Sequence, residues 1–202
     1  MKKLYQNIED INIKGGVDQL SEMVSAMDVS LQRIADDTDK VLNFLAKYSS
    51  SNKGQQYEKV VTTALRLRDE LFDASLELND MQNQIVEYQN KIYRYEDMSA
   101  NAKQPNKYMI TKRNVSVETD AVQFRLNEMV QVAAALNAYN DQVYHSIKGI
   151  NSKKNAIAMF WMDSQYKDFS DFIDSITRSI VDGLRVFDEY VKVLEEKIKE
   201  LS

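Results

Sequence analysis

Few side chains in this sequence have the chemistry needed for catalysis. His145 is the only histidine, and the chain contains no cysteine. A histidine-based triad, a thiolate nucleophile and the paired Glu-x-x-His ligands of di-iron bundles therefore cannot be assembled from it. We interpret His145 as an imidazole that faces solvent or a partner. The sequence predicts no catalytic residue and no enzyme activity.

Two groups of carboxylates are the remaining candidates, as ligands of a cation. The groups consist of Asp36, Asp37 and Asp39, and of Asp168, Asp171 and Asp174. Both groups fall in stretches with a helical pattern, and both lack the loop glycine and backbone carbonyl oxygens that complete calcium sites. We interpret them as solvated helix faces, so the sequence predicts no metal site and no cofactor.

The composition favours a protein made of long helices. Of the 202 residues, 44% are hydrophobic, which is enough for a folded core, whereas five glycines and one proline are few for a sheet or a loop-rich fold. The 31 acidic and 26 basic residues are spread along the chain and give a net charge of −5. No basic stripe is present that would neutralise phosphates, so we expect no nucleic-acid partner.

Apolar residues recur at alternating steps of three and four, which is the spacing of one face of an α-helix. A first run extends from Val17 to Tyr48 and a second from Tyr57 to Tyr95. Residues 49–54, which lie between them, combine weak helix formers with a glycine and predict a turn. A third run extends over residues 122–161 and a fourth over residues 166–201.

These runs predict an all-α fold of two long antiparallel helical hairpins in tandem. Residues 99–120 lose the helical period and contain Pro105, which predicts a linker between a first hairpin, 11–98, and a second, 121–202. Near-regular heptads joined by short turns are typical of antiparallel coiled coils. Because each hairpin carries apolar residues beside its main seam, we expect the two to close an elongated four-helix bundle.

The two halves also resemble each other, which predicts an internal duplication. Gln56-Tyr57 recurs 109 positions later as Gln165-Tyr166, and the second helices superpose in register at that offset. The first helices share Leu20-Ser-Glu-Met-Val24 and Leu126-Asn-Glu-Met-Val130, preceded by the β-like pairs Ile11-Asn-Ile13 and Val115-Ser-Val117. A shared order of β-like pair, helix, turn, Gln-Tyr and helix is typical of a repeat.

The second half resembles the WXG family, the small helical hairpins exported by type VII secretion systems. Trp161-Met162-Asp163 lies at its turn, where the family has Trp-x-Gly, and Asp163 stands in place of the glycine. The matching tripeptide of the first half, Asn52-Lys53-Gly54, keeps the glycine and lacks the tryptophan. The resemblance covers residues 115–201 and, more weakly, 11–95.

The resemblance implies that Trp161 packs across the two helices of its hairpin and that the chain acts by helix-face association. Family members pair as antiparallel dimers, so a fused pair would form its own four-helix bundle. The implied partner is a protein: secretion machinery, an effector or a second helical hairpin protein, with a homodimer as a further arrangement. The alternative from a different class is an intracellular coiled-coil scaffold or effector chaperone that is not exported.

Export in the family is linked to Tyr-x-x-x-Asp/Glu after the second helix. Tyr93 and Asp97 fit this pattern at the end of the first hairpin, as a weak candidate because tyrosines and carboxylates are frequent in this chain. The N-terminus becomes polar before an apolar region forms, and the longest apolar run, 156–162, is short for a membrane span. We expect no integral membrane segment, and a protein that is secreted without a cleaved signal peptide or is cytoplasmic before export.

Aromatic and polar residues at unusual places complete the candidate list. Phe160, Tyr166, Phe169 and Phe172 surround Trp161 in the sequence, either as the core of the hairpin tip or as a partner surface. Asn140, Lys154 and Lys197 fall on otherwise apolar seams. We expect Asn140 to fix the register of the helices and Lys197 to extend its charged end into solvent.

Overall fold

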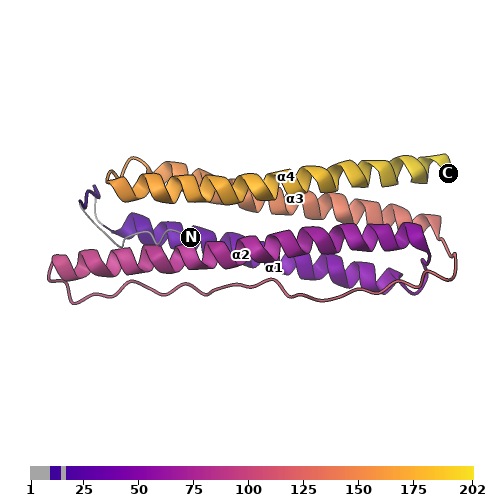
Figure 1. The fold of residues 1–202 in the computed structure, drawn as a ribbon, viewed down its shortest axis with the longest axis horizontal. Coiled ribbons are helices and arrows are strands. Elements are labelled where there is room, and N and C mark those ends of the chain that lie inside the picture. Colours follow the sequence, from indigo (N-terminus) through magenta and orange to yellow (C-terminus); the bar gives the residue numbers. More distant parts are fainter. Residues whose placement is uncertain (1–9, 15–16) are drawn as a thin grey trace. The chain divides into compact units, whose positions relative to one another are not determined.

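The computed structural model of this chain describes residues 10–14 and 17–202. It contains four helices: α1, Asp18–Tyr48; α2, Gln55–Tyr95; α3, Leu126–Ile157; and α4, Ser164–Glu200 (Figure 1). In the described residues β-pairing is limited to two isolated bridges, Ile13 with Trp161 and Lys53 with Gln123. The predicted all-α fold is confirmed. None of the four helices is apolar enough over a sufficient length to cross a membrane.

The helix ends follow local physical rules. Helices α1, α2 and α3 each carry a carboxylate in the first turn and a basic residue in the last turn, where the helix dipole favours these charges. Gly54 precedes α2 with a φ of 98°, a left-handed conformation that favours glycine, and a Cβ there would lie 3.1 Å from the Ala121 carbonyl oxygen. The residues before α2 and α4, Gly54 and Asp163, are separated by the predicted offset of 109.

The chain divides into two compact units, and each contains a segment of every helix. The first unit comprises residues up to Gln32, Ala74–Met109 and Ser146–Arg178. The second unit comprises Arg33–Asp73, Ile110–His145 and Ser179–Ser202. Each hairpin therefore contributes to both units.

Within the first unit, adjacent helices run antiparallel. Gln89 donates its side-chain hydrogen bond to the Val17 carbonyl oxygen at 3.0 Å, and Gln82 donates to Val24 at 3.1 Å, so α2 descends as α1 ascends. The α3 and α4 segments are joined by an ion pair between Lys154 and Asp174. A second ion pair, between Lys153 of α3 and Glu22 of α1, links the two hairpins.

Within the second unit, the four helix segments form a closed ring of contacts. Tyr57 of α2 donates to the Leu45 carbonyl oxygen of α1 at 2.7 Å, and Asn137 of α3 donates to Glu195 of α4 at 2.7 Å. The hairpins meet where Thr38 of α1 and Tyr139 of α3 share a buried hydrogen bond of 2.9 Å. Lys197 of α4 donates to Gln56 of α2 at 3.2 Å, which completes the ring. The predicted bundle of two hairpins is confirmed within this unit.

The core of both units consists of the apolar seams read from the sequence. Its largest fully buried side chains include Trp161, Tyr88, Phe169 and Phe187, together with Leu20, Leu31, Leu45, Leu71 and Leu78. The three-four spacing places these residues on the inward side of each helix. Burial of apolar surface is the main contribution to the stability of such a bundle.

The stretch between α2 and α3, residues 96–125, contains no helix and includes the predicted linker, 99–120. Side chains of the first hairpin hold its backbone. In the first unit, Asn79 donates to the Tyr108 carbonyl oxygen at 2.8 Å, and Ala102 N donates to Asn90 Oδ1 at 2.8 Å. In the second unit, Arg68 donates to the Arg113 carbonyl oxygen. These hydrogen bonds satisfy backbone groups that a helix or strand would otherwise pair, and they hold the segment against α2.

Candidate functional site

Trp161 is the centre of the α3–α4 turn in the first unit. Its side chain is 1% exposed, so the predicted burial is confirmed. The indole ring stacks on Tyr88 of α2, with ring centroids 5.5 Å apart, and on Phe169 of α4, at 5.2 Å. The Tyr166 ring packs against the indole in an edge-to-face arrangement, with ring centroids 5.9 Å apart. The indole thus contacts both helical hairpins, and aromatic contacts of this kind add to the stability gained from burial alone.

Asp163 accepts several hydrogen bonds at the same turn. Its buried carboxylate accepts from the Trp161 indole at 2.7 Å and from the Gln165 backbone N–H at 3.0 Å. The second bond is that of an N-cap residue at the start of α4. The Asn12 backbone N–H, at 3.2 Å, and the Tyr88 hydroxyl donate to its other oxygen. The Asp163 carboxylate thus connects the segment before α1, helix α2 and the α3–α4 turn within the first unit.

The segment before α1 pairs with this turn. Ile13 forms an antiparallel bridge with Trp161. The backbone bonds run from Lys14 N to Phe160 O, at 2.7 Å, and from Met162 N to Asn12 O, at 2.8 Å. The tip of the second hairpin is therefore completed by the segment that precedes α1.

The α1–α2 turn in the second unit is completed in the reciprocal way. Lys53 forms a bridge with Gln123, with a 2.8 Å bond from Lys53 N to Gln123 O, and Gly54 N donates to the Glu118 carbonyl oxygen at 2.8 Å. The Lys53 ammonium pairs with the Glu118 carboxylate at 2.6 Å. We expected the β-like pair before α3 to be Val115 and Val117. The bridge instead involves Gln123, and Val115 is buried elsewhere in the segment between α2 and α3.

Asn52 is the polar centre of this second turn. Its amide oxygen accepts from the Arg125 backbone N–H at 3.0 Å, and its amide nitrogen donates to Glu128 at 2.7 Å. Glu128 also accepts from the Ser51 hydroxyl at 2.5 Å. These bonds, that from Ser51 first, lower the pKa of the Glu128 carboxyl below its ordinary value. Asn52 and Asp163 thus both accept a hydrogen bond from the backbone N–H of a segment that belongs to the other hairpin.

Burial raises the pKa of several tyrosines, two of them beside the turns. Burial raises the pKa of the Tyr88 phenol, and its hydrogen bond to Asp163 raises it further. Burial also raises the pKa of Tyr57 and of Tyr139. Each hydroxyl is therefore a neutral hydrogen-bonding group at physiological pH and not an acid or base poised to react.

The aromatic residues predicted as a partner surface separate into two groups. Phe169 is fully buried against Trp161, so its assignment to a partner surface is wrong and the core interpretation holds for it. Phe160, Tyr166 and Phe172 are half-buried. They keep some exposed aromatic surface near the tip, beside the exposed Met162.

The candidate export pair lies at the C-terminal end of α2. Tyr93 is buried in the last turn, whereas Asp97 is exposed just beyond it with a φ of 51°. Met98 N donates to the Tyr93 carbonyl oxygen at 2.9 Å, and Asp97 N donates to Arg94 at 3.3 Å, the two bonds of a Schellman motif. The pair therefore has a structural role as the cap of this helix.

The polar residues on the seams differ in their surroundings. Lys154 is buried and paired with Asp174, whereas Lys197 is exposed, as expected. The Asn140 amide oxygen is buried and has no hydrogen-bond partner among the described residues. In the same part of the chain, no group of three His, Cys, Asp or Glu side chains is arranged to hold a metal ion. His145 is exposed and its ring lies 6.1 Å from that of Tyr144.

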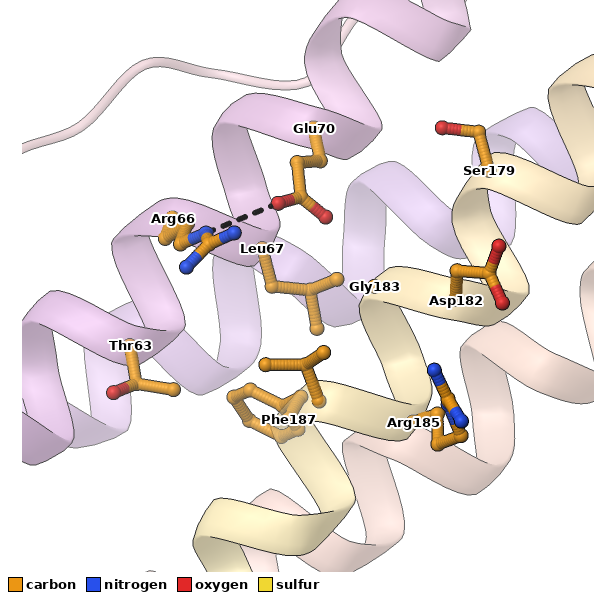
Figure 2. A pocket seen from close by; sticks show the side chains of 10 residues that line it. Thr63, Arg66, Leu67, Glu70, Ser179, Asp182, Gly183, Arg185 and Phe187 are labelled. Atoms are coloured by element: carbon orange, nitrogen blue, oxygen red, sulfur yellow. Dashed lines mark hydrogen bonds and ion pairs between the residues drawn. The ribbon is translucent and has the colours of Figure 1, made fainter.

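Cavities lie against these elements. A polar one of about 330 Å³ lies between α2 and α4 in the second unit, and Figure 2 shows Arg66 and Glu70 of α2 beside it, joined by an ion pair. Glu70 extends toward Gly183 of α4, where an added Cβ would come within 2.2 Å of its carboxylate. Two mainly apolar cavities lie elsewhere, about 480 Å³ in the first unit and about 470 Å³ in the second.

No protein-family model matches this chain, and searches of the curated proteins and of the solved structures find no match. The resemblance to the WXG family consequently rests on the sequence pattern at the two turns. The sequence pattern did not identify Tyr88, Asn12 or Glu128, which complete those turns. Only the N-capping residue type of Asp163 carried a signal for its role.

Proposed function

We propose that this chain is a tandem WXG-like hairpin protein that serves a type VII-like secretion system as a substrate, partner or targeting component, acting by helix-face association. The observation that carries the proposal is the reciprocal completion of the two turns. Ile13 before α1 pairs with the second hairpin's turn, and Gln123 before α3 pairs with the first hairpin's turn. This reciprocity supports the proposal that the chain is a fused pair of similar hairpins.

The contacts at the tips support association and not chemistry as the activity. The functional groups at the turns, Asp163 and Asn52, are engaged in hydrogen bonds to backbone and side chains. The tyrosines beside them are buried and held neutral. What remains accessible is helix surface, including the exposed side chains of Val181, Val186 and Val193 on α4.

The experiment is an export assay in the source cell. We expect the full chain, with its N-terminus uncleaved, in the culture supernatant of growing cells, and its loss from there when the secretion ATPase is inactivated. A chain that stays inside the cell in a stable complex would instead support the alternative of an intracellular scaffold or effector chaperone.

A pair of variants tests the export candidate. Asp97→Asn removes the carboxylate and keeps a residue that tolerates a left-handed φ, whereas Glu96→Gln removes the neighbouring exposed carboxylate. Export should fall for Asp97→Asn and stay unchanged for Glu96→Gln. Equal export of both variants would remove Asp97 from the proposal.

A further inference from the structure

The apolar cavity of the second unit has the properties of a small-molecule site. It lies where the α1–α2 turn, the segment before α3 and the last turns of α4 meet, and its volume is about 470 Å³. Ligand sites of this size are typically lined by apolar side chains with few polar groups. Its apolar lining consists of Val122, Phe124, Met129, Leu194, Ile198 and Leu201. We call it the α4-end cavity.

The floor and the rim of the α4-end cavity differ in exposure. Met129, Leu194 and Ile198 are buried and form the floor. Val122 is 93% exposed and Leu201 is 63% exposed at the rim. A bound apolar chain would cover side chains that otherwise contact water, which is favourable in proportion to the area covered.

Lys197 is the side chain that determines which ligand charge the cavity favours. Two lysines line the cavity, and no carboxylate does. Lys53 is neutralised by Glu118 at 2.6 Å. Lys197 donates to the neutral Gln56 amide at 3.2 Å and forms no ion pair with the described carboxylates. The N-terminal end of α2 and the C-terminal end of α4 meet here, so helix dipoles of opposite sign face the cavity.

The apolar cavity of the first unit supplies an internal contrast. It is built from matching parts, the segment before α1 and the end of α2, with Ile92 in place of Leu201. Its charged lining residues are Asp18 and Glu96. An anion would be repelled there, so the two cavities differ in the charge that they accept.

We propose that the α4-end cavity binds an amphiphilic monocarboxylate of the medium-chain fatty acid class. The alkyl chain lies on Met129, Leu194 and Ile198, and the carboxylate takes the place of Gln56 as the partner of Lys197. The cavity combines a volume of about 470 Å³ with a mainly apolar lining, and Lys197 carries a charge that none of the lining residues neutralises. The site is independent of the proposed role in secretion.

The test is a titration of the full-length chain with decanoate below its micelle concentration, followed by calorimetry and by amide chemical shifts. We expect one saturable site and shifts centred on Met129 and Ile198. Lys197→Gln should weaken binding about three- to fivefold, the range of an exposed ion pair. Lys199→Gln, which removes an exposed lysine of the same helix outside the cavity, should leave the affinity unchanged. Decyltrimethylammonium should bind more weakly than decanoate.

A second variant keeps the test decisive if Lys197→Gln alters the fold. Val122→Glu places a carboxylate on the most exposed rim residue and should abolish decanoate binding while the helical spectrum stays unchanged. The proposal is overturned if decanoate shows no saturable binding, if the shifts centre on Ile92, or if both lysine variants bind like the unaltered chain. A chain that sediments as a dimer, and as a monomer with Val122→Glu, would assign the rim to self-association and also overturn it.

Discussion

Tyr88 of α2 donates a hydrogen bond to Asp163, the residue that caps α4. The bond joins the second helix of one hairpin to the start of the second helix of the other. Asp163→Ala removes the cap and leaves the Tyr88 hydroxyl and the Trp161 indole N–H without their buried acceptor. We expect a loss of about 2 to 4 kcal/mol in the free energy of unfolding, measured in urea.

The matched control is Asp168→Asn, which removes an exposed carboxylate from the first turns of the same helix. Its unfolding midpoint should stay within error of the unaltered chain. Asp163→Gly, which also removes the carboxylate, should be destabilised as Asp163→Ala is. An Asp163→Gly variant as stable as the unaltered chain would show that the carboxylate has no structural role.

Trp161→Ala should cost about 3 to 5 kcal/mol, because it leaves a cavity between Tyr88 and Phe169 in the first unit. Met162→Ala changes the exposed neighbour in the same turn and should have little effect. Thermal unfolding followed by circular dichroism gives both values. An unchanged midpoint for Trp161→Ala would contradict the role of the indole as the centre of the tip.

The features that could be predicted are those that follow the helical spacing of apolar residues along the sequence. Seams of apolar residues at three-four spacing located all four helices, and the offset of 109 between Gly54 and Asp163 reproduces the offset read from Gln56-Tyr57 and Gln165-Tyr166. The burial of Trp161 was implied by the resemblance of its turn to the Trp-x-Gly pattern. Each of these features leaves a regular or compositional mark on the sequence.

The features that the sequence did not predict depend on single hydrogen bonds between distant residues. Asn79 and Arg68 hold the segment between α2 and α3 through its backbone carbonyl oxygens, and any sequence offers such carbonyls. The bridge to Lys53 is formed by Gln123 and not by the β-branched Val115, which is buried. Propensity therefore identified an extended segment but not its register.

The buried tyrosines predict a loss of stability at alkaline pH. Burial raises the pKa of Tyr190 to about 12 and that of Tyr139 further, whereas an unfolded tyrosine titrates near 10. The folded state therefore favours the neutral phenol, and this contribution is complete below about pH 10 and is lost as the pH rises from there toward the folded-state pKa.

Urea midpoints measured from about pH 9 to about pH 12 should fall steadily, with tyrosinate absorbance rising as the chain unfolds. Tyr190→Phe removes one such group without changing the ring and should reduce the slope. A midpoint that is independent of pH in this window would contradict the burial of these hydroxyls.

Asn140→Leu should raise the free energy of unfolding by about 1 kcal/mol, because it replaces a buried amide oxygen that has no hydrogen-bond partner within residues 10–14 and 17–202. If Asn140 also fixes the register, the variant should show additional oligomeric species by native mass spectrometry. A more stable variant with a single species would limit Asn140 to a stability cost. A less stable one would show that its amide is satisfied in solution.

The association of the two hairpins predicts the outcome of cutting the chain between them. A protease site inserted between the exposed Lys103 and Gln104 leaves the hairpins covalently separate. The buried Thr38–Tyr139 bond in the second unit and the Tyr88–Asp163 bond in the first unit join residues of different hairpins. Since these contacts and the apolar core beneath them do not pass through the cut, we expect the halves to elute together at the size of one intact chain. Urea should separate them, and its removal should restore the complex. Halves that part without denaturant, or an intact chain that sediments as a dimer and dissociates only into unfolded monomers, would show that the tandem hairpins serve assembly between chains instead.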